Sequence, residues 1–139
     1  MCGSLILSQA ALKILSCTYL VKASGMSRTR FKALKIVKAI CELLDGLGIP
    51  SCIPPSLSSL QVLASTGHPT DRAGAIVAVR NSLVHSEKSA SGLPVTEAWV
   101  LAQRFVELVL LTFCGFNGEH ANRTMSPRWV GQVERVPWA

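Results

Sequence analysis

The sequence predicts a single all-α domain, a bundle of about five helices followed by an irregular C-terminal extension. Three observations lead to this prediction. Hydrophobic residues make up 49% of the 139 residues and charged residues only 16%, which supplies enough apolar surface for one buried core. Apolar residues recur at helical spacing over long stretches, and glycine and proline fall between these stretches. We assign residues 1–116 to the bundle and residues 117–139 to an irregular or hairpin-like extension packed on it through its tryptophans.

The first expected helix covers residues 4–22 and is almost entirely apolar. Its polar residues Gln9, Lys13 and Ser16 share one narrow strip, so we expect the rest of its circumference to be buried. Gly25 follows the helix and ends it, because glycine readily adopts the left-handed conformation that closes helices.

A second helix is expected to begin after Ser27, a typical N-cap residue, and to run to residue 44 or 47, where Gly46 and Gly48 end it. Its core face is predicted from apolar residues at helical spacing. These residues are Phe31, Leu34, Val37, Cys41 and Leu44.

Prolines at positions 50, 54 and 55 then require an extended loop. A short helix is expected over residues 56–64, a turn over 67–69, and a further helix over 71–86 with Thr70 as its N-cap. After a loop at residues 89–94, a strongly apolar helix runs from Val95 to Cys114 and ends at Gly115. We predict that this last helix is the most buried of the bundle.

Positive charge is concentrated in the N-terminal part of the chain. The net charge is +6, and residues 1–41 contain no Asp or Glu. Such a field favours an acidic partner, with nucleic acid first and an anionic membrane surface second, and solvated helix faces are the alternative. Four basic residues of the second expected helix form the predicted nucleic-acid-binding stripe: Arg28, Lys32, Lys35 and Lys38.

The five cysteines are widely spaced and form no C-x-x-C pair, which favours reduced thiols and a cytoplasmic protein. Histidine and cysteine do not cluster, so we predict no metal site and no cofactor. Lys13, Arg104 and Glu107 interrupt the longest apolar runs, so we expect no membrane-spanning helix. His68 and His120 have no chemical context in the sequence and are interpreted as incidental.

The helix over residues 71–86 carries the candidate chemistry. On a helical wheel centred on Ile76, Arg80 falls inside the apolar arc, where an unpaired guanidinium is costly. We therefore expect Arg80 to find a partner or to line a pocket. Asn81 and His85 are four residues apart and lie one above the other at the edge of this arc.

Two interpretations of this helix remain open from its residues alone. Small residues at positions 74, 78 and 82, namely Gly74, Ala78 and Ser82, would let a second copy of the helix approach, which favours a homodimer. Alternatively, Arg80 pairs with Glu97 or Glu107 of the next helix, and His85 only caps its own helix.

Residues 80–85, with the sequence RNSLVH, resemble the R-x4-H signature of the HEPN superfamily, in which an arginine, usually followed by a polar residue, precedes a histidine near a helix end. The stretch from Ile49-Pro50 to Pro137-Trp138 is similar to the ApeA-like HEPN branch. The resemblance implies a HEPN-like helical bundle that dimerises, so that two copies of the motif form one ribonuclease site. It also implies RNA as partner and Arg80, Asn81 and His85 as catalytic residues.

The function that follows is a metal-independent endoribonuclease that leaves 2′,3′-cyclic phosphate ends. In the ApeA-like branch this module forms the C-terminal part of a longer chain. The resemblance therefore implies an N-terminal sensing domain outside this one. It also implies a role as effector of an anti-phage or toxin-like defence protein. The alternative is a non-catalytic HEPN-like module that dimerises or binds a nucleotide or partner. A membrane-surface role for the acid-free helices is a third interpretation.

Overall fold

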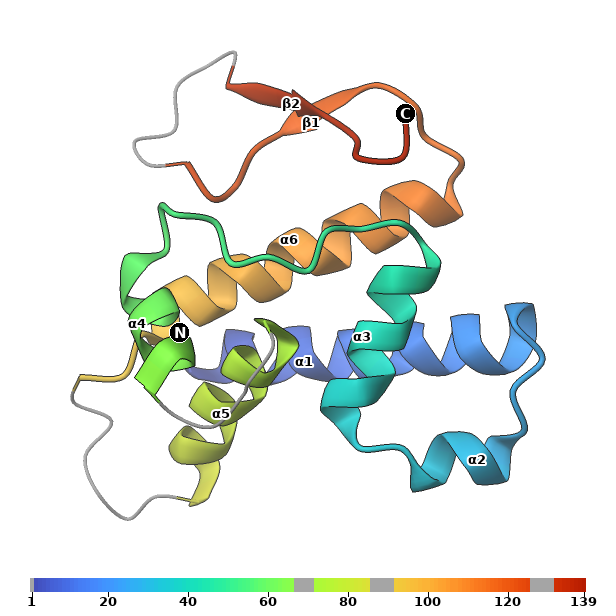
Figure 1. Ribbon diagram of the computed structural model, residues 1–139, viewed down its shortest axis with the longest axis horizontal. Helices are drawn as coiled ribbons and strands as arrows, with labels where there is room; N and C mark the ends of the chain where they lie inside the picture. Colours follow the sequence, from blue (N-terminus) through green and yellow to red (C-terminus); the bar gives the residue numbers. More distant parts are fainter. Residues whose placement is uncertain (1, 67–71, 86–91, 126–131) are drawn as a thin grey trace.

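The computed structural model describes residues 2–66, 72–85, 92–125 and 132–139. In these ranges the chain forms six α-helices and one two-stranded sheet, which confirms the predicted all-α bundle with a C-terminal extension (Figure 1). The helices are α1 Cys2–Cys17, α2 Arg28–Ala33, α3 Ile36–Gly46, α4 Ser58–Thr66, α5 Arg72–His85 and α6 Val95–Phe113. The strands are β1 Glu119–Ala121 and β2 Val133–Arg135. The expected turn at 67–69 and the N-cap at Thr70 lie outside the described residues.

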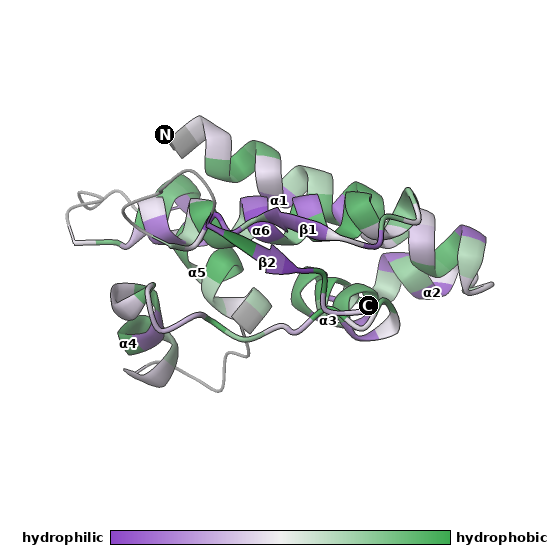
Figure 2. Cartoon of the chain, turned by 90° about the horizontal axis from the view of Figure 1, so that it is seen from above, coloured by the Kyte–Doolittle hydropathy of each residue, from purple (hydrophilic) through white to green (hydrophobic). Residues whose placement is uncertain are grey.

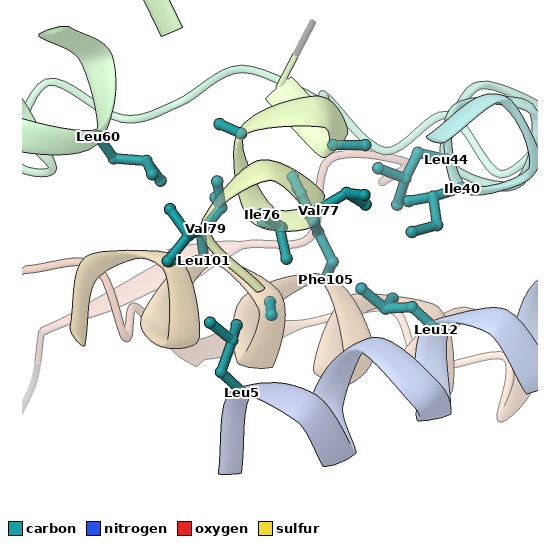
Figure 3. Packing of buried hydrophobic residues seen from close by; sticks show 14 of the residues in the cluster. Leu5, Leu12, Ile40, Leu44, Leu60, Ile76, Val77, Val79, Leu101 and Phe105 are labelled. Atoms are coloured by element: carbon teal, nitrogen blue, oxygen red, sulfur yellow. The ribbon is translucent and has the colours of Figure 1, made fainter. Parts of the chain in front are cut away.

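The core lies where five helices meet. Helix α1 packs along α6, and α5 packs against both of them. Helix α3 contacts α1 and α5, and α4 contacts α5 and α6 (Figure 1). Figure 3 shows one fully buried side chain from each of these helices in the cluster: Leu12, Ile40, Leu60, Ile76 and Phe105. Burial of each such side chain stabilises the fold by roughly 1.5–3 kcal/mol.

Helix α1 is turned relative to the expected orientation, so that Leu5 and Leu12 are buried together with part of the polar strip. Gln9 and Ser16, two members of its polar strip, are buried against the bundle, and the Ser16 hydroxyl donates to the carbonyl of Leu12 at 2.7 Å. On the other side, Leu7 is 72% and Ile14 66% exposed. Figure 2 shows α1 at the edge of the molecule with hydrophobic residues along its length. The prediction of a largely buried helix is therefore wrong, because α6, α3 and α5 cover only one side of it.

Glycines end the first and third helices as predicted. After α1 the chain continues through a π-helical turn, η1 Thr18–Ala23, to Gly25, whose φ is +73°. Helix α3 ends at Gly46, and Gly48 follows with φ +67°. Gly46 also allows a close approach, because a Cβ there would lie 2.8 Å from the ring of Tyr19, whose hydroxyl donates to the Gly46 carbonyl at 3.0 Å.

The expected second helix is broken into α2 and α3. Its N-cap is confirmed, since the Ser27 side chain accepts a hydrogen bond from the backbone N–H of Arg30 at 3.2 Å. However, Leu34 and Lys35 are extended, with ψ angles of 135° and 142°. No glycine or proline marks this break. Helix α2 contributes no buried residue. In α3 the predicted Leu44 is buried and the predicted Val37 and Cys41 pack against the core, while Ala39, Ile40 and Leu43 are buried in addition.

The most enclosed part of the bundle is the first half of α5. Residues 73–77 are all buried, which requires neighbours on every side of a helix, and α1, α3, α4 and α6 supply them. Helix α6 was predicted to be the most buried, but it leaves Leu110 46% and Phe113 41% exposed. That prediction is therefore wrong.

The C-terminal extension is a hairpin attached to the bundle. Strands β1 and β2 pair antiparallel, with His120 opposite Glu134 (Figure 1). Val136 is buried, and the Trp138 indole packs against the core and donates from Nε1 to the carbonyl of Phe116 at 2.9 Å. The predicted packing through tryptophan is confirmed at Trp138, whereas Trp129 lies outside the described residues.

One helical stretch, Gly3–Ala23, is long and apolar enough to cross a membrane, and 33% of its most apolar window is buried within the bundle. Lys13 therefore does not prevent a stretch of this length and hydropathy, and the expectation of no membrane-spanning helix stays a prediction. The core helix of a soluble protein passes the same test of length and composition, so a single such helix is weak support for a membrane span.

Candidate functional site

Helix α5 presents Arg80 and Asn81 together at the surface of the bundle. Nη1 of Arg80 donates a hydrogen bond to Oδ1 of Asn81 at 3.1 Å. Arg80 is half-buried and Asn81 is exposed, which matches their predicted places inside and at the edge of the apolar arc. A guanidinium carries five N–H donors, so this bond orients the group and leaves most of its donors for other acceptors.

Arg80 and Asn81 open onto a surface cavity of about 380 Å³, which we call the motif cavity. Three helices line it, with Ile6, Gln9, Ala10 and Lys13 from α1, Ile36 from α3, and Arg80 and Asn81 from α5. Its described lining contains two cations and no carboxylate, so its potential is positive. The prediction that Arg80 lines a pocket is confirmed.

Gln9 gives the motif cavity an unsatisfied polar group. The side chain is only 9% exposed, and its buried Oε1 accepts no hydrogen bond within the described residues. A buried acceptor without a donor costs roughly 1–3 kcal/mol. This oxygen is enclosed, so a ligand or water would reach it and recover that free energy only after the Gln9 side chain rotates.

The two carboxylates that the alternative interpretation assigned to Arg80 have other partners. Oε2 of Glu97 accepts a hydrogen bond at 2.8 Å from the backbone N–H of Leu60, in the first turn of α4. Glu107 forms an ion pair with Arg123. Across the described residues no ion pair involves Arg80. The interpretation of Arg80 as the partner of Glu97 or Glu107 is therefore wrong.

His85 is the last residue of α5, one turn beyond Asn81, and its side chain is exposed. It shares a helix face with Asn81 through the four-residue spacing. The residues that line the motif cavity include Arg80 and Asn81 but not His85. One copy of the chain therefore brings two of the three predicted catalytic residues into the cavity and leaves the third beside it.

The small residues of α5 are buried or half-buried within their own chain. Gly74 is buried, and Ala78 and Ser82 are half-buried. Helices of the same chain cover the first half of α5, so Gly74 cannot meet a second copy. The predicted interface is wrong at this position.

The four basic residues predicted as one stripe are divided between two helices. Arg28 and Lys32 lie in α2, Lys35 is the N-cap of α3, and Lys38 lies in α3. All four are exposed, but the extended backbone at Leu34 and Lys35 removes the shared helix face. Lys32 lines a cavity next to the motif cavity, together with Lys13.

A polar cluster joins the hairpin to α6. The carboxylate of Glu134 forms an ion pair with Arg104, lies 3.2 Å from Nε2 of His120, and accepts a hydrogen bond from Nδ2 of Asn122 at 2.8 Å. Nδ1 of His120 lies 3.2 Å from the carbonyl oxygen of Ala121. His120 therefore belongs to a structural cluster, and its interpretation as incidental to the chemistry stays a prediction. Strand register creates this cluster, and no sequence motif indicates it.

In the described ranges no three His, Cys, Asp or Glu side chains come together as a group that could hold a metal ion. Cys17, Cys41, Cys52 and Cys114 form no disulfide.

Comparison with known proteins gives a family match over nearly the whole chain. The family model described as the YopA C-terminal domain matches residues 1–135. A curated relative, the SPbeta prophage-derived uncharacterized protein YopA of Bacillus subtilis (strain 168), is 26% identical over 135 residues. The match covers 94% of this chain and 30% of that relative, so the chain spans 30% of the relative's length. No solved structure matches the chain significantly.

Proposed function

The chain belongs to the YopA C-terminal domain family, and we propose that this domain is a metal-independent endoribonuclease of the HEPN type. The observation that supports the proposal is the motif cavity. Arg80 and Lys13 make it cationic, its described lining holds no carboxylate, and Asn81 orients the guanidinium. A phosphodiester is the kind of group that such a cavity attracts.

The proposed reaction is a transesterification within the RNA chain. A base removes the proton of the ribose 2′-hydroxyl, and that oxygen attacks the adjacent phosphorus. The bond from phosphorus to the 5′-oxygen breaks, and an acid protonates the departing oxygen, which leaves a 2′,3′-cyclic phosphate and a 5′-hydroxyl. His85 acts as the base or the acid, and Arg80 binds the phosphate oxygens and stabilises the charge of the transition state.

We propose further that the active form is a homodimer. His85 is exposed and does not line the motif cavity of its own chain, so in this proposal two copies together gather Arg80, Asn81 and His85 around one phosphate. Asn81 takes the role of a positioning residue in this proposal, because it holds Arg80.

The proposed setting is the cytoplasm, where RNA is available, and the proposed role is the effector module of an anti-phage or toxin-like defence protein. The name of the relative gives it a prophage origin, which supports an activity during phage infection of a host cell. The proposal includes an N-terminal domain that senses the trigger; the matched relative is long enough to contain further domains, since the match covers 30% of it.

The position of His85 also favours a second function. In this alternative the domain does not catalyse a reaction, and the motif cavity binds a nucleotide or partner through Arg80 and Lys13 while two copies pair. Incubating the purified chain with end-labelled RNA in excess chelator separates the two functions. The nuclease gives fragments that end in a 2′,3′-cyclic phosphate, whereas intact RNA that remains bound supports the binding module and contradicts the nuclease.

A further inference from the structure

The motif cavity has a neighbour. A second cavity of about 210 Å³, which we call the adjoining cavity, is lined by Lys13, Phe31, Lys32, Leu34, Ile36 and Ala39. Lys13 and Ile36 belong to the linings of both cavities. The two cavities therefore lie next to each other, with Lys13 and Ile36 forming their shared wall.

The walls of the two cavities offer different chemistry. The motif cavity presents the Arg80 guanidinium and the amides of Gln9 and Asn81. The adjoining cavity presents the ring of Phe31, which is half-buried, and the exposed Lys32. An aromatic ring at a surface hollow accepts the face of a nucleobase, and lysine binds phosphate as a point charge.

We infer that the two cavities hold consecutive nucleotides of a single-stranded RNA. Lys13 and Arg80 bind the phosphate in the motif cavity, Phe31 stacks on the base of the neighbouring nucleotide, and Lys32 pairs with the next phosphate. A duplex keeps its bases stacked inside the helix and cannot offer one to Phe31, so the arrangement selects single strands. The choice of RNA as the ligand rests on the proposed ribonuclease function.

The proposal includes a sugar contact at Gln9 that does not depend on the charges. Its buried Oε1 accepts no hydrogen bond from the described residues, and the 2′-hydroxyl of RNA is a donor that DNA lacks. We place that hydroxyl against the Gln9 amide, whose side chain must rotate to bring the enclosed Oε1 to the cavity. This contact favours RNA over a DNA strand of the same sequence.

Binding is measured by fluorescence anisotropy with a labelled single-stranded RNA in chelator, using chains that also carry His85→Ala so that the RNA stays intact. Phe31→Ala should weaken binding about tenfold or more, because base stacking on an aromatic ring is lost. Lys13→Gln and Lys32→Gln should each lower the slope of log affinity against log salt by about one. Lys22→Gln is the matched control, since it removes an exposed charge that lines neither cavity.

Gln9→Met tests the sugar contact, because it keeps the length of the side chain and removes its acceptor. It should reduce the preference for RNA over DNA while circular dichroism shows a folded bundle. Tight binding of duplex RNA, or Lys13→Gln and Phe31→Ala chains that bind like the Lys22→Gln chain, would overturn the inference.

Cleavage by the chain with His85 intact is measured separately, so that the two proposals can fail independently. If that chain cuts RNA and its Lys13→Gln and Phe31→Ala forms cut and bind equally well, the nuclease stands and the two-cavity inference is overturned. If it never cuts but single-stranded RNA binds in a Phe31-dependent way, the inference stands and the nuclease does not. If it neither cuts nor binds RNA, both are overturned.

Discussion

Arg80 and Asn81, neighbours in the chain, join their side chains through a hydrogen bond of 3.1 Å at the edge of the motif cavity. Consecutive residues of a helix point about 100° apart, so the two side chains must turn toward each other to make this contact. A neutral amide therefore orients the guanidinium, and no carboxylate in the described ranges neutralises it. This arrangement suits an arginine that binds an anionic ligand.

The first prediction concerns the stability of the Arg80→Ala chain. Because Arg80 is half-buried and hydrogen-bonded to the exposed Asn81, its loss should change the free energy of unfolding by less than about 1 kcal/mol. Thermal unfolding followed by circular dichroism measures this change. A fall of several kcal/mol would instead identify Arg80 as a structural residue of the bundle.

The second prediction concerns Glu97, which accepts the Leu60 N–H in the first turn of α4. Glu97→Ala should lower the free energy of unfolding by about 1–2 kcal/mol, as the loss of a helix cap does. Glu97→Gln keeps an oxygen acceptor and should cost less. Glu119→Ala, at an exposed position of β1, is the control. Equal midpoints for the two alanine variants would refute the capping role.

The third prediction concerns the attachment of the hairpin. Glu134→Ala removes the contacts to Arg104, His120 and Asn122 together and should cost about 1–3 kcal/mol of local stability. Hydrogen–deuterium exchange should then become faster at the amides of residues 119–122 and 133–136. Amides in the buried half of α6 serve as the internal control. Unchanged protection of the hairpin would show that Val136 and Trp138 hold it without the polar cluster.

The fourth prediction is a homodimer that covers the exposed face of α1. Leu7 and Ile14 are the most exposed large hydrophobic residues described, and their seven-residue spacing places them on one face of the helix. Sedimentation velocity should show a dimer at tens of micromolar protein, and the double change Leu7→Glu, Ile14→Glu should dissociate it. Val62→Glu, at an exposed apolar position of α4, should leave it intact. A monomeric parent chain at that concentration would exclude the composite site.

The parts of the fold that were predictable from the sequence depend on local signals. Ser27 begins α2, Gly25 and Gly115 follow helix ends, and the prolines fix the loop after α3. The break at Leu34 has no such signal, since neither a glycine nor a proline lies between α2 and α3. The exposed side of α1 was not predictable either, since hydropathy alone does not tell which apolar side faces the other helices.

Some residues of the candidate site were likewise predictable from the sequence, and others were not. The unusual position of Arg80 was predictable from a helical wheel, because it depends only on the neighbours of Arg80 in α5. Lys13 and Gln9 lie about seventy residues earlier, and packing of α1 against α5 brings them to the same cavity. The polar strip that they share on α1 is visible in the sequence. No sequence pattern, however, indicates that this strip lies next to Arg80. Phe31 was predicted as a core residue, and the broken helix places it at the adjoining cavity.

The measurement that tests the central proposal most directly is cleavage of labelled RNA in chelator by the parent chain and by His85→Ala, Arg80→Ala and Asn81→Ala. The account predicts cyclic phosphate ends for the parent chain, a loss of about 10² to 10⁴ in rate without His85, and a loss of about 10² to 10³ without Arg80. Asn81→Ala should be milder, since Asn81 acts through Arg80. All four chains should show the same helical spectrum. Intact RNA with the folded parent chain, or His85→Ala and Arg80→Ala chains that cut at its rate, would contradict the assignment of this motif as a ribonuclease site.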